Sequence, residues 1–259
     1  MTIRSFLVAS CITMTLLGCT HYSESNGWIN LFNSENLNNW SVKINHYEVG
    51  ENFGNTFRFE NEILKVRYDQ YDFTDEFGHI FYKTPFKNFH LSVDYRFSGE
   101  FEKNAPTYAE LNSGVMFFSQ GVATLKKDQG WPISIEMQYL ADLGDGKRTT
   151  GNMCSPGTNI RYQGKTYTDH CLNSNMPALP KEQWVTAELI VRDSNITHLI
   201  NGKVVLEYSQ PTIDAEDKII TGQDPQLMEG GKALQSGYIA LQSEGQPIEF
   251  KNVRIEVLK

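Results

Sequence analysis

Apolar and polar residues alternate with a period of two along much of this 259-residue chain. Residues 89–97 read Phe-His-Leu-Ser-Val-Asp-Tyr-Arg-Phe, and residues 184–192 repeat the pattern with Val185 and Val191 on one face. This is the period of a β-strand with one buried face. Asn201-Gly202 stands between two apolar runs, which is a strong hairpin signal. Helical periodicity is almost absent, so the pattern predicts an all-β sandwich or barrel.

The first nineteen residues have the features of an export signal. Arg4 precedes an apolar run from Phe6 to Leu17 that is too short to span a bilayer. The run ends in Leu-Leu-Gly-Cys, which resembles a bacterial lipoprotein signal. Residues 1–18 are then removed, Cys19 carries the lipid anchor, and residues 19–27 form a tether. No acidic residue follows Cys19 directly, which favours the outer membrane, facing the periplasm. The alternative is an ordinary cleaved signal with a chance cysteine.

The net charge of the chain limits the classes of ligand that it is expected to bind. The formal net charge of the chain is −8 at pH 7. Nucleic-acid binding requires a basic face, so this balance argues against a nucleic-acid partner. It suits neutral or cationic ligands.

Two cysteines, Cys154 and Cys171, remain beyond the export signal. Exported proteins meet an oxidising compartment, so this pair is predicted to form a disulfide. A pair of free thiols is the alternative. A metal site is less favoured, because only His170 stands near as a further soft ligand.

The segment from residue 133 to residue 140 reads as a strand with two different faces. Alternation places Glu136 and Gln138 on one face with Ser134, and Met137 and Tyr139 on the other. A strand of this kind can line a polar groove with its Glu-x-Gln face. The alternative is an edge strand whose polar face is simply solvated.

His198 stands within a strand pattern, on a face shared with Ile196 and Ile200. One interpretation is a histidine that titrates near neutral pH and transfers protons. The other is a core histidine that is hydrogen-bonded to the backbone. Asn112 opens a further apolar strand, in which Gly114 either allows close approach of a ligand or marks a turn.

These segments together resemble one known family. Residues 28–40 (WINLFNSENLNNW) are similar to the opening of the 3-keto-disaccharide hydrolase family, and the resemblance continues in order to residue 259 through KNFHLSVDYRF, NSGVMFF, ISIEMQYL, WVTAELIVRDSNITHLINGKVV and YIALQSEGQPIEFKNVRIEVL. The resemblance implies a single domain over residues 28–259. It also implies a concanavalin A-like jelly roll, in which two antiparallel sheets pack together and one of them carries a sugar groove.

The resemblance implies cleavage of glycosidic bonds in 3-keto glycosides. Ordinary glycosidases need two carboxylic groups that flank the bond. Jelly-roll glucanases carry both on one strand, whereas here Glu136 is followed by Gln138 and Ala141. A ketone at C3 acidifies the hydrogen at C2, so a single base can start an elimination that water addition completes. Glu136 and His198 are the expected proton-transfer residues, with their roles unassigned.

The resemblance also suggests what surrounds these residues. Gln138, Asn112 and Gln242 are expected to contact sugar hydroxyls, and His170 is expected to reach the rim of the groove. A divalent metal could polarise the ketone, although the chain has no tight ligand motif. A separate sugar 3-oxidoreductase is implied as the source of the ketone.

A fold alone does not fix activity, so other functions stay open. The first is a carbohydrate-binding lipoprotein on the same fold, with Trp131 and Tyr139 as aromatic platforms and without catalysis. The second is a structural protein of the envelope, which would not bind small sugars.

Overall fold

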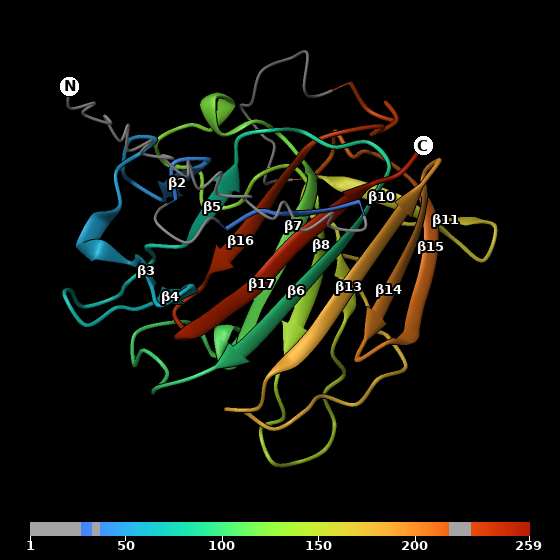
Figure 1. Cartoon of the computed structure of the whole chain (residues 1–259). Helices are drawn as coiled ribbons and strands as arrows, with labels where there is room; N and C mark the ends of the chain where they lie inside the picture. The colour runs from blue at the N-terminus through green and yellow to red at the C-terminus, as the bar shows by residue number, and fades with distance from the viewer. Residues whose placement is uncertain (1–26, 33–36, 218–228) are drawn as a thin grey trace, which may run out of the picture.

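The computed structural model describes residues 27–32, 37–217 and 229–259. Within these residues it contains seventeen strands and three short 3₁₀ turns, and all the strand pairs are antiparallel. The strands form two sheets that lie one in front of the other (Figure 1). This confirms the all-β jelly-roll sandwich. The predicted signal peptide and Cys19 lie outside the described residues.

The larger sheet has ten strands. Its order is β11 (Lys165–Tyr167), β10 (Thr158–Tyr162), β15 (Lys203–Ile213), β14 (Asn195–Ile200), β13 (Val185–Arg192), β6 (Phe89–Phe97), β17 (Ile248–Val257), β4 (Ile63–Val66) and β3 (Phe57–Glu60), with β1 (Trp28–Asn30) pairing with β17.

The smaller sheet has seven strands. Its order is β12 (Cys171–Leu172), β9 (Asn152–Cys154), β8 (Ile135–Leu140), β7 (Asn112–Ser119), β16 (Tyr238–Ser243), β5 (Gly78–Tyr82) and β2 (Trp40–Ile44). The 3₁₀ turns are η1 (Phe53–Asn55), η2 (Thr107–Ala109) and η3 (Val122–Thr124).

The core lies between the two sheets, where alternate residues of each strand face inward. Phe250 and Leu241 are fully buried, one from each sheet. The rings of Tyr95 and Tyr139 stack across the interface at 4.2 Å with an interplanar angle of 3°. Burial of such large side chains contributes roughly 2–3 kcal/mol each. The core therefore fixes which face of each strand points outward.

The hairpin predicted at Asn201-Gly202 is present between β14 and β15. Both turn residues have positive φ, 49° and 74°, as a type I′ hairpin turn requires. The turn before β14 is made by Asp193 and Ser194, with φ of 49° and 64°, and Asn195 already belongs to β14.

The outer face of the seven-stranded sheet, called here the pocket face, is half covered by residues 120–134. Leu125 of this segment belongs to a small apolar cluster with Phe81 of β5. Lys43 Nζ on β2 donates a hydrogen bond to the Lys127 carbonyl at 2.8 Å. The cover therefore lies over β2, β5, β16 and the part of β7 around Met116, whereas Asn112 of β7 and residues of β8 and β9 line a pocket beside it.

The structure contains the predicted disulfide between Cys154 and Cys171. The two cysteines face each other in the register of β9 and β12, and Cys154 is also the register partner of Glu136 on β8. The bond therefore attaches the two-residue edge strand β12 to the sheet at the level of Glu136.

Replacing both Cys154 and Cys171 by serine is expected to lower the free energy of unfolding by about 3 kcal/mol, because the unfolded chain regains the freedom of a loop of this length. Urea denaturation with and without a thiol reductant measures the effect. The wild type in reductant should approach the variant. Equal stability of the oxidised wild type and the variant would contradict the expectation.

In the described part of the chain, no helix has the length and apolar character needed to cross a bilayer.

Candidate functional site

A pocket of about 400 Å³ opens on the uncovered half of the pocket face. Strands β7, β8 and β9, the turn η2 and the segment around the disulfide supply its walls. Its lining residues come from these elements, from the covering segment 120–134 and from the loop after β16: Tyr108, Asn112, Trp131, Glu136, Gln138, Cys154, Pro156, His170, Cys171 and Glu244. The volume lies in the range of small-molecule sites.

Glu136 lies on the floor of this pocket. Alternation along β8 directs Glu136 outward while Met137 enters the core, as the sequence predicts. Its carboxyl group bends over Gly114 of β7, since a Cβ added at Gly114 would lie 2.3 Å from Glu136 Oε1. Oε1 is buried and has no hydrogen-bond partner. Burial, and then the charge of Glu244, raise the pKa of Glu136 well above its ordinary value.

A second carboxyl group, Glu244, shares the pocket, although the sequence suggested a single one. Glu244 directly follows β16 and is 4% exposed. The Trp131 indole N–H donates a hydrogen bond to it, and Oε2 has no partner. Burial raises the pKa of Glu244 to about 8, against the lowering effect of the Trp131 hydrogen bond. The expectation of a lone carboxylate on one strand is therefore corrected: the partner comes from the end of another strand.

Trp131 is itself held in place. The centroid of its ring lies 4.6 Å from that of Phe77, with an interplanar angle of 34°. Trp131 belongs to the covering segment, packs against its small apolar cluster and lines the pocket. Trp131 thus lines the pocket as the carbohydrate-binding alternative supposed. Tyr139 does not, because it faces the core and stacks on Tyr95. The suggestion of Tyr139 as a sugar platform is corrected by this placement.

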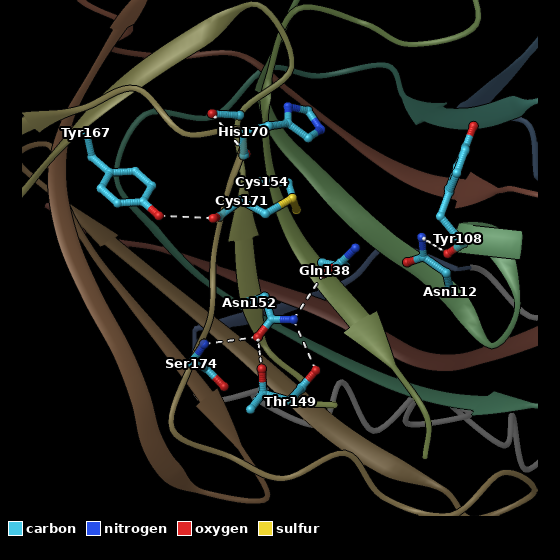
Figure 2. The surroundings of a disulfide bond; sticks show 11 residues. Tyr108, Asn112, Gln138, Thr149, Asn152, Cys154, Tyr167, His170, Cys171 and Ser174 are labelled. Carbon is cyan, nitrogen blue, oxygen red and sulfur yellow. Dashed lines mark hydrogen bonds between the residues drawn. A yellow bond between two sulfur atoms is a disulfide. The ribbon is translucent and has the colours of Figure 1, made fainter. Parts of the chain in front are cut away.

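Gln138 is oriented by a buried amide network. Asn152 Nδ2 donates to Gln138 Oε1 at 3.0 Å, and Thr149 Oγ1 donates to Asn152 Oδ1 at 2.7 Å. The Ser174 backbone N–H donates to the same Asn152 oxygen at 2.9 Å. The Gln138 carbonyl is thereby occupied, and Figure 2 shows its amide nitrogen directed away from Asn152. Gln138 therefore offers hydrogen-bond donors to a ligand.

Asn112 and His170 also line the pocket, as the resemblance suggested. Asn112 Nδ2 donates to the Tyr108 carbonyl at 3.2 Å, which leaves its buried Oδ1 without a partner. His170 is exposed, and its carbonyl accepts a hydrogen bond from the Ser155 backbone N–H at 2.9 Å. The structure thus brings Glu136, Gln138, Asn112 and His170 together around one cavity.

Gln242 lies near the pocket but is buried and does not line it. It lies on β16, two residues before Glu244, and is 1% exposed. It is the register partner of His79 on β5, under the covered half of the face. Gln242 Oε1 and His79 Nε2 are buried without partners. Gln242 is therefore not among the pocket-lining residues, and a direct sugar contact does not follow from this placement.

His198 is not brought to the pocket. It lies on β14 of the other sheet, faces the core and is fully buried. Nδ1 donates to the Gly151 carbonyl at 2.9 Å, and Nε2 accepts from the Tyr208 hydroxyl at 2.8 Å. Burial lowers the pKa of His198 to about 4. This arrangement corresponds to the core-histidine interpretation, so the expected proton-transfer role of His198 is corrected: both ring nitrogens are engaged away from the pocket.

No group of three or more His, Cys, Asp or Glu side chains is placed to hold a metal ion within the described ranges. The divalent metal suggested by the chemistry stays a prediction.

Substitution of Gly114 by alanine is expected to displace the Glu136 carboxyl group without unfolding the sheet. The new methyl group would meet the end of a flexible side chain, which can move. Misplacement of a reacting group by about 1 Å can cost roughly 10²-fold in rate, so turnover should fall by about 10–100-fold while the melting temperature changes little. Gly130→Ala, where the nearest atoms are 3.8 Å and 3.9 Å away, is the matched control and should keep its turnover.

The fold and the pocket define a class: a jelly-roll protein that holds two buried carboxyl groups and several amides in one cavity. Comparisons with known proteins agree. A family model described as the 3-keto-alpha-glucoside-1,2-lyase-like domain matches residues 27–256. The chain belongs to this family.

One similar protein is a 3-keto-disaccharide hydrolase of Bacteroides thetaiotaomicron, 24% identical over 193 residues; the match covers 70% of this chain and 62% of that relative's length. Two crystal structures from Parabacteroides distasonis ATCC 8503, provisionally described as glycosyl hydrolases, share the fold. One has 16% identity and a TM-score of 0.54, covering 90% of this chain and 94% of that chain. The other has 20% identity and a TM-score of 0.51, covering 89% and 99%.

Proposed function

We propose that this protein cleaves the glycosidic bond of 3-keto glycosides by elimination and hydration, with Glu244 as the base and Glu136 as the acid. The observation that carries the proposal is the pair of carboxyl groups in one pocket with different hydrogen bonding. Trp131 donates to Glu244, which favours the ionised form of that group. Glu136 receives no hydrogen bond on its buried oxygen and lies next to Glu244, so it keeps its proton.

The steps balance with these two groups and one water molecule. The Glu244 carboxylate removes the proton at C2, and the electron pair moves to the C3 oxygen as an enolate. The enolate collapses to a ketone as the bond from C1 to the leaving oxygen breaks, and this oxygen takes the proton of Glu136. Water then adds to C1, its proton returns to Glu136, and Glu244 protonates C2. Amide donors of Gln138 support the enolate oxygen in this scheme.

A substrate screen tests the proposal. The protein is incubated with 3-keto glucosides and with their unoxidised parents, with and without a divalent metal, and products are followed by NMR. Cleavage restricted to the keto substrates, with deuterium from the solvent appearing at C2, is the expected result. Equal cleavage of the unoxidised parents would contradict it. Binding without cleavage would favour the carbohydrate-binding alternative, and neither binding nor cleavage would favour a structural protein of the envelope.

The chemistry requires a ketone that another enzyme must supply. A sugar 3-oxidoreductase, which removes two electrons and two protons at C3, is the class of reaction that would precede this one. Its presence in the same compartment is part of the proposal.

The proposed site of action is the bacterial envelope, with a lipid on Cys19 that anchors the protein to the outer membrane, facing the periplasm. The Leu-Leu-Gly-Cys sequence after the apolar run supports this location. Cys19→Ala is expected to give a soluble or unprocessed form on membrane fractionation. A lipidated membrane-bound Cys19→Ala protein would contradict the anchor.

A further inference from the structure

The walls of the pocket carry acidic side chains and no lysine or arginine among the described residues that line it. The acidic residues are Glu136 and Glu244, and the net charge of the whole chain, −8, has the same sign. Within the described part of the chain, the one group that acts to lower the pKa of either carboxyl is the neutral indole of Trp131. An ionised carboxyl group in this pocket therefore attracts a cationic ligand.

The pocket also contains acceptor atoms that the protein leaves unpaired. Glu136 Oε1, Glu244 Oε2 and Asn112 Oδ1 are buried, and no described residue donates a hydrogen bond to them. The three residues that carry these oxygens are only 4–6% exposed. The side chain of Asn112 is fixed because its Nδ2 donates to the Tyr108 carbonyl (Figure 2), which leaves Oδ1 for a ligand. A ligand that donates several hydrogen bonds would satisfy these buried acceptors.

A protonated amine matches these walls better than a hydroxyl group does. An ammonium group has three N–H donors and no acceptor. Its hydrogen bonds to a carboxylate are charge-assisted and roughly twice as strong as those between neutral groups. It also balances the buried charge of the carboxylate, which is costly when it stands alone. A sugar that carries an amine is therefore expected to bind more tightly than its hydroxyl parent.

Gln138 limits the position of the amine on the sugar ring. Asn152 occupies the Gln138 carbonyl at 3.0 Å, so Gln138 presents N–H donors to the pocket. These donors suit a sugar oxygen and repel an ammonium group. In the proposed reaction Gln138 faces the oxygen at C3, whereas Glu244 faces C2. An amine at C2 would therefore meet Glu244, and an amine at C3 would meet Gln138.

We propose that the pocket selects sugars with a protonated amine at C2, and that a 2-amino-2-deoxy glycoside without a ketone pairs with Glu244 and blocks the reaction. The orientation of the sugar in this inference rests on the proposed function. The preference for a cation rests on the charges and the unpaired acceptors of the pocket.

Calorimetric titration tests the preference at about pH 8, where Glu244 is partly ionised and an amine similar to an α-amino group is partly protonated. The probes are methyl 2-amino-2-deoxyglucoside, its N-acetyl derivative and methyl glucoside. The amine is expected to bind about tenfold more tightly than methyl glucoside, and the uncharged N-acetyl derivative should lack this advantage. Equal affinities of the wild type for the amine and for methyl glucoside would overturn the inference.

Two variants locate the preference in the pocket. Glu244→Gln should lose the advantage of the amine and keep the affinity for methyl glucoside. Glu188→Gln, on β13 of the other sheet, removes a carboxyl group of the same kind and should bind both probes as the wild type does. An advantage of the amine that persists undiminished in Glu244→Gln would overturn the pairing.

Proton release provides an independent measure of the pairing. At about pH 7 the free amine and Glu244 both hold protons, because burial raises the pKa of Glu244 to about 8. The complex holds one proton between them, so binding should release close to one proton, measured by calorimetry in two buffers of different ionisation enthalpy. Glu244→Gln retains the other titratable lining groups, Glu136, Tyr108 and His170, and should release none. Equal release by the wild type and the variant would contradict the pairing.

These measurements need no turnover, so they separate the inference from the proposed function. Tighter binding of the amine without cleavage of any 3-keto glucoside would support the preference for a cation and overturn the proposed function. Methyl 3-amino-3-deoxyglucoside should bind more weakly than the 2-amino isomer, because its amine meets the donors of Gln138. Equal binding of the two isomers would overturn the placement at C2. Where cleavage is observed, the 2-amino glucoside should inhibit it competitively.

Discussion

Replacing Glu244 by glutamine is expected to lower turnover on every 3-keto glycoside by roughly 10²–10⁴-fold, the usual cost of losing a general base. Glutamine keeps the shape and the hydrogen bond from Trp131, but it cannot take the proton from C2. The exchange of the C2 hydrogen with deuterated water should disappear together with turnover. In the wild type, kcat/KM should rise with pH through about 8, because burial raises the pKa of Glu244 to about 8 and the base must be ionised.

Replacing Glu136 by glutamine should give a different pattern. Exchange at C2 should persist, because the base is intact, whereas release of an alcohol leaving group should fall by roughly 10²–10⁴-fold. A leaving group that needs no proton, such as 4-nitrophenolate, should restore most of the rate. Glu188→Gln, on the ten-stranded sheet beside His90, is the control carboxyl and should behave as the wild type. Loss of exchange in Glu136→Gln with full exchange in Glu244→Gln would reverse the two roles.

The orientation of Glu136 could be predicted because a strand has only two faces. Ile135, Met137 and Tyr139 are apolar and must enter the core, so Glu136 and Gln138 must point outward. The same reasoning applies to β6 and β13, whose bounds agree with the alternation to within one residue. Local patterning therefore supplies the strands, their faces and the first carboxyl group of the pocket.

Glu244 could not be assigned to the site in this way. The period of two that runs through Ala240 and Gln242 does continue to Glu244, so the sequence contained a signal for its face. What the sequence lacks is the order of strands: β16 lies beside β7, and β7 beside β8. β16 is separated from β7 and β8 along the chain by about a hundred residues, and only its long-range pairing with β7 brings Glu244 to Glu136.

For His198, the sequence indicated a buried side chain but not the groups that contact it. The apolar face that it shares with Ile196 and Ile200 was evident from alternation, and the structure places all three in the core. The sequence could not show that Gly151 and Tyr208 meet the two ring nitrogens. A buried histidine with both nitrogens engaged satisfies the ordinary rule for buried polar groups, and needs no catalytic explanation.

Glutamine at position 244 is also expected to stabilise the folded protein at alkaline pH. The pKa of Glu244 is raised from 4.5 to about 8 by burial, so the folded state holds a proton that the unfolded state has lost between these values. Stability of the wild type therefore falls as pH rises from about 4.5 to about 8, and stays low above it. A tenfold change in an ionisation constant corresponds to about 1.4 kcal/mol, so the gain in Glu244→Gln should reach a few kcal/mol at about pH 9 and vanish near pH 4.

Glu249 provides a matched control, because the shift of its pKa and the resulting change of stability with pH have the opposite sign. It too is buried, at 5% exposure, but it accepts hydrogen bonds from Arg67 and Arg96. Burial acts to raise its pKa, and the two arginines outweigh this, so that the pKa of Glu249 is lowered. Its contribution to stability is present above the unfolded pKa and is lost as pH falls. Glu249→Gln should therefore destabilise the protein at neutral and alkaline pH, and least in acid.

Urea denaturation of the two variants at about pH 4, 7 and 9 measures both effects. Glu244→Gln should become more stable than the wild type as pH rises, while Glu249→Gln becomes less stable. A carboxyl group that weakens the fold at the pH where it is ionised does not serve stability, and this result would support the proposed role of Glu244 in proton transfer. Equal or lower stability of Glu244→Gln at about pH 9 would mean that Glu244 is stabilised in its ionised form, and the argument from its burial would fail.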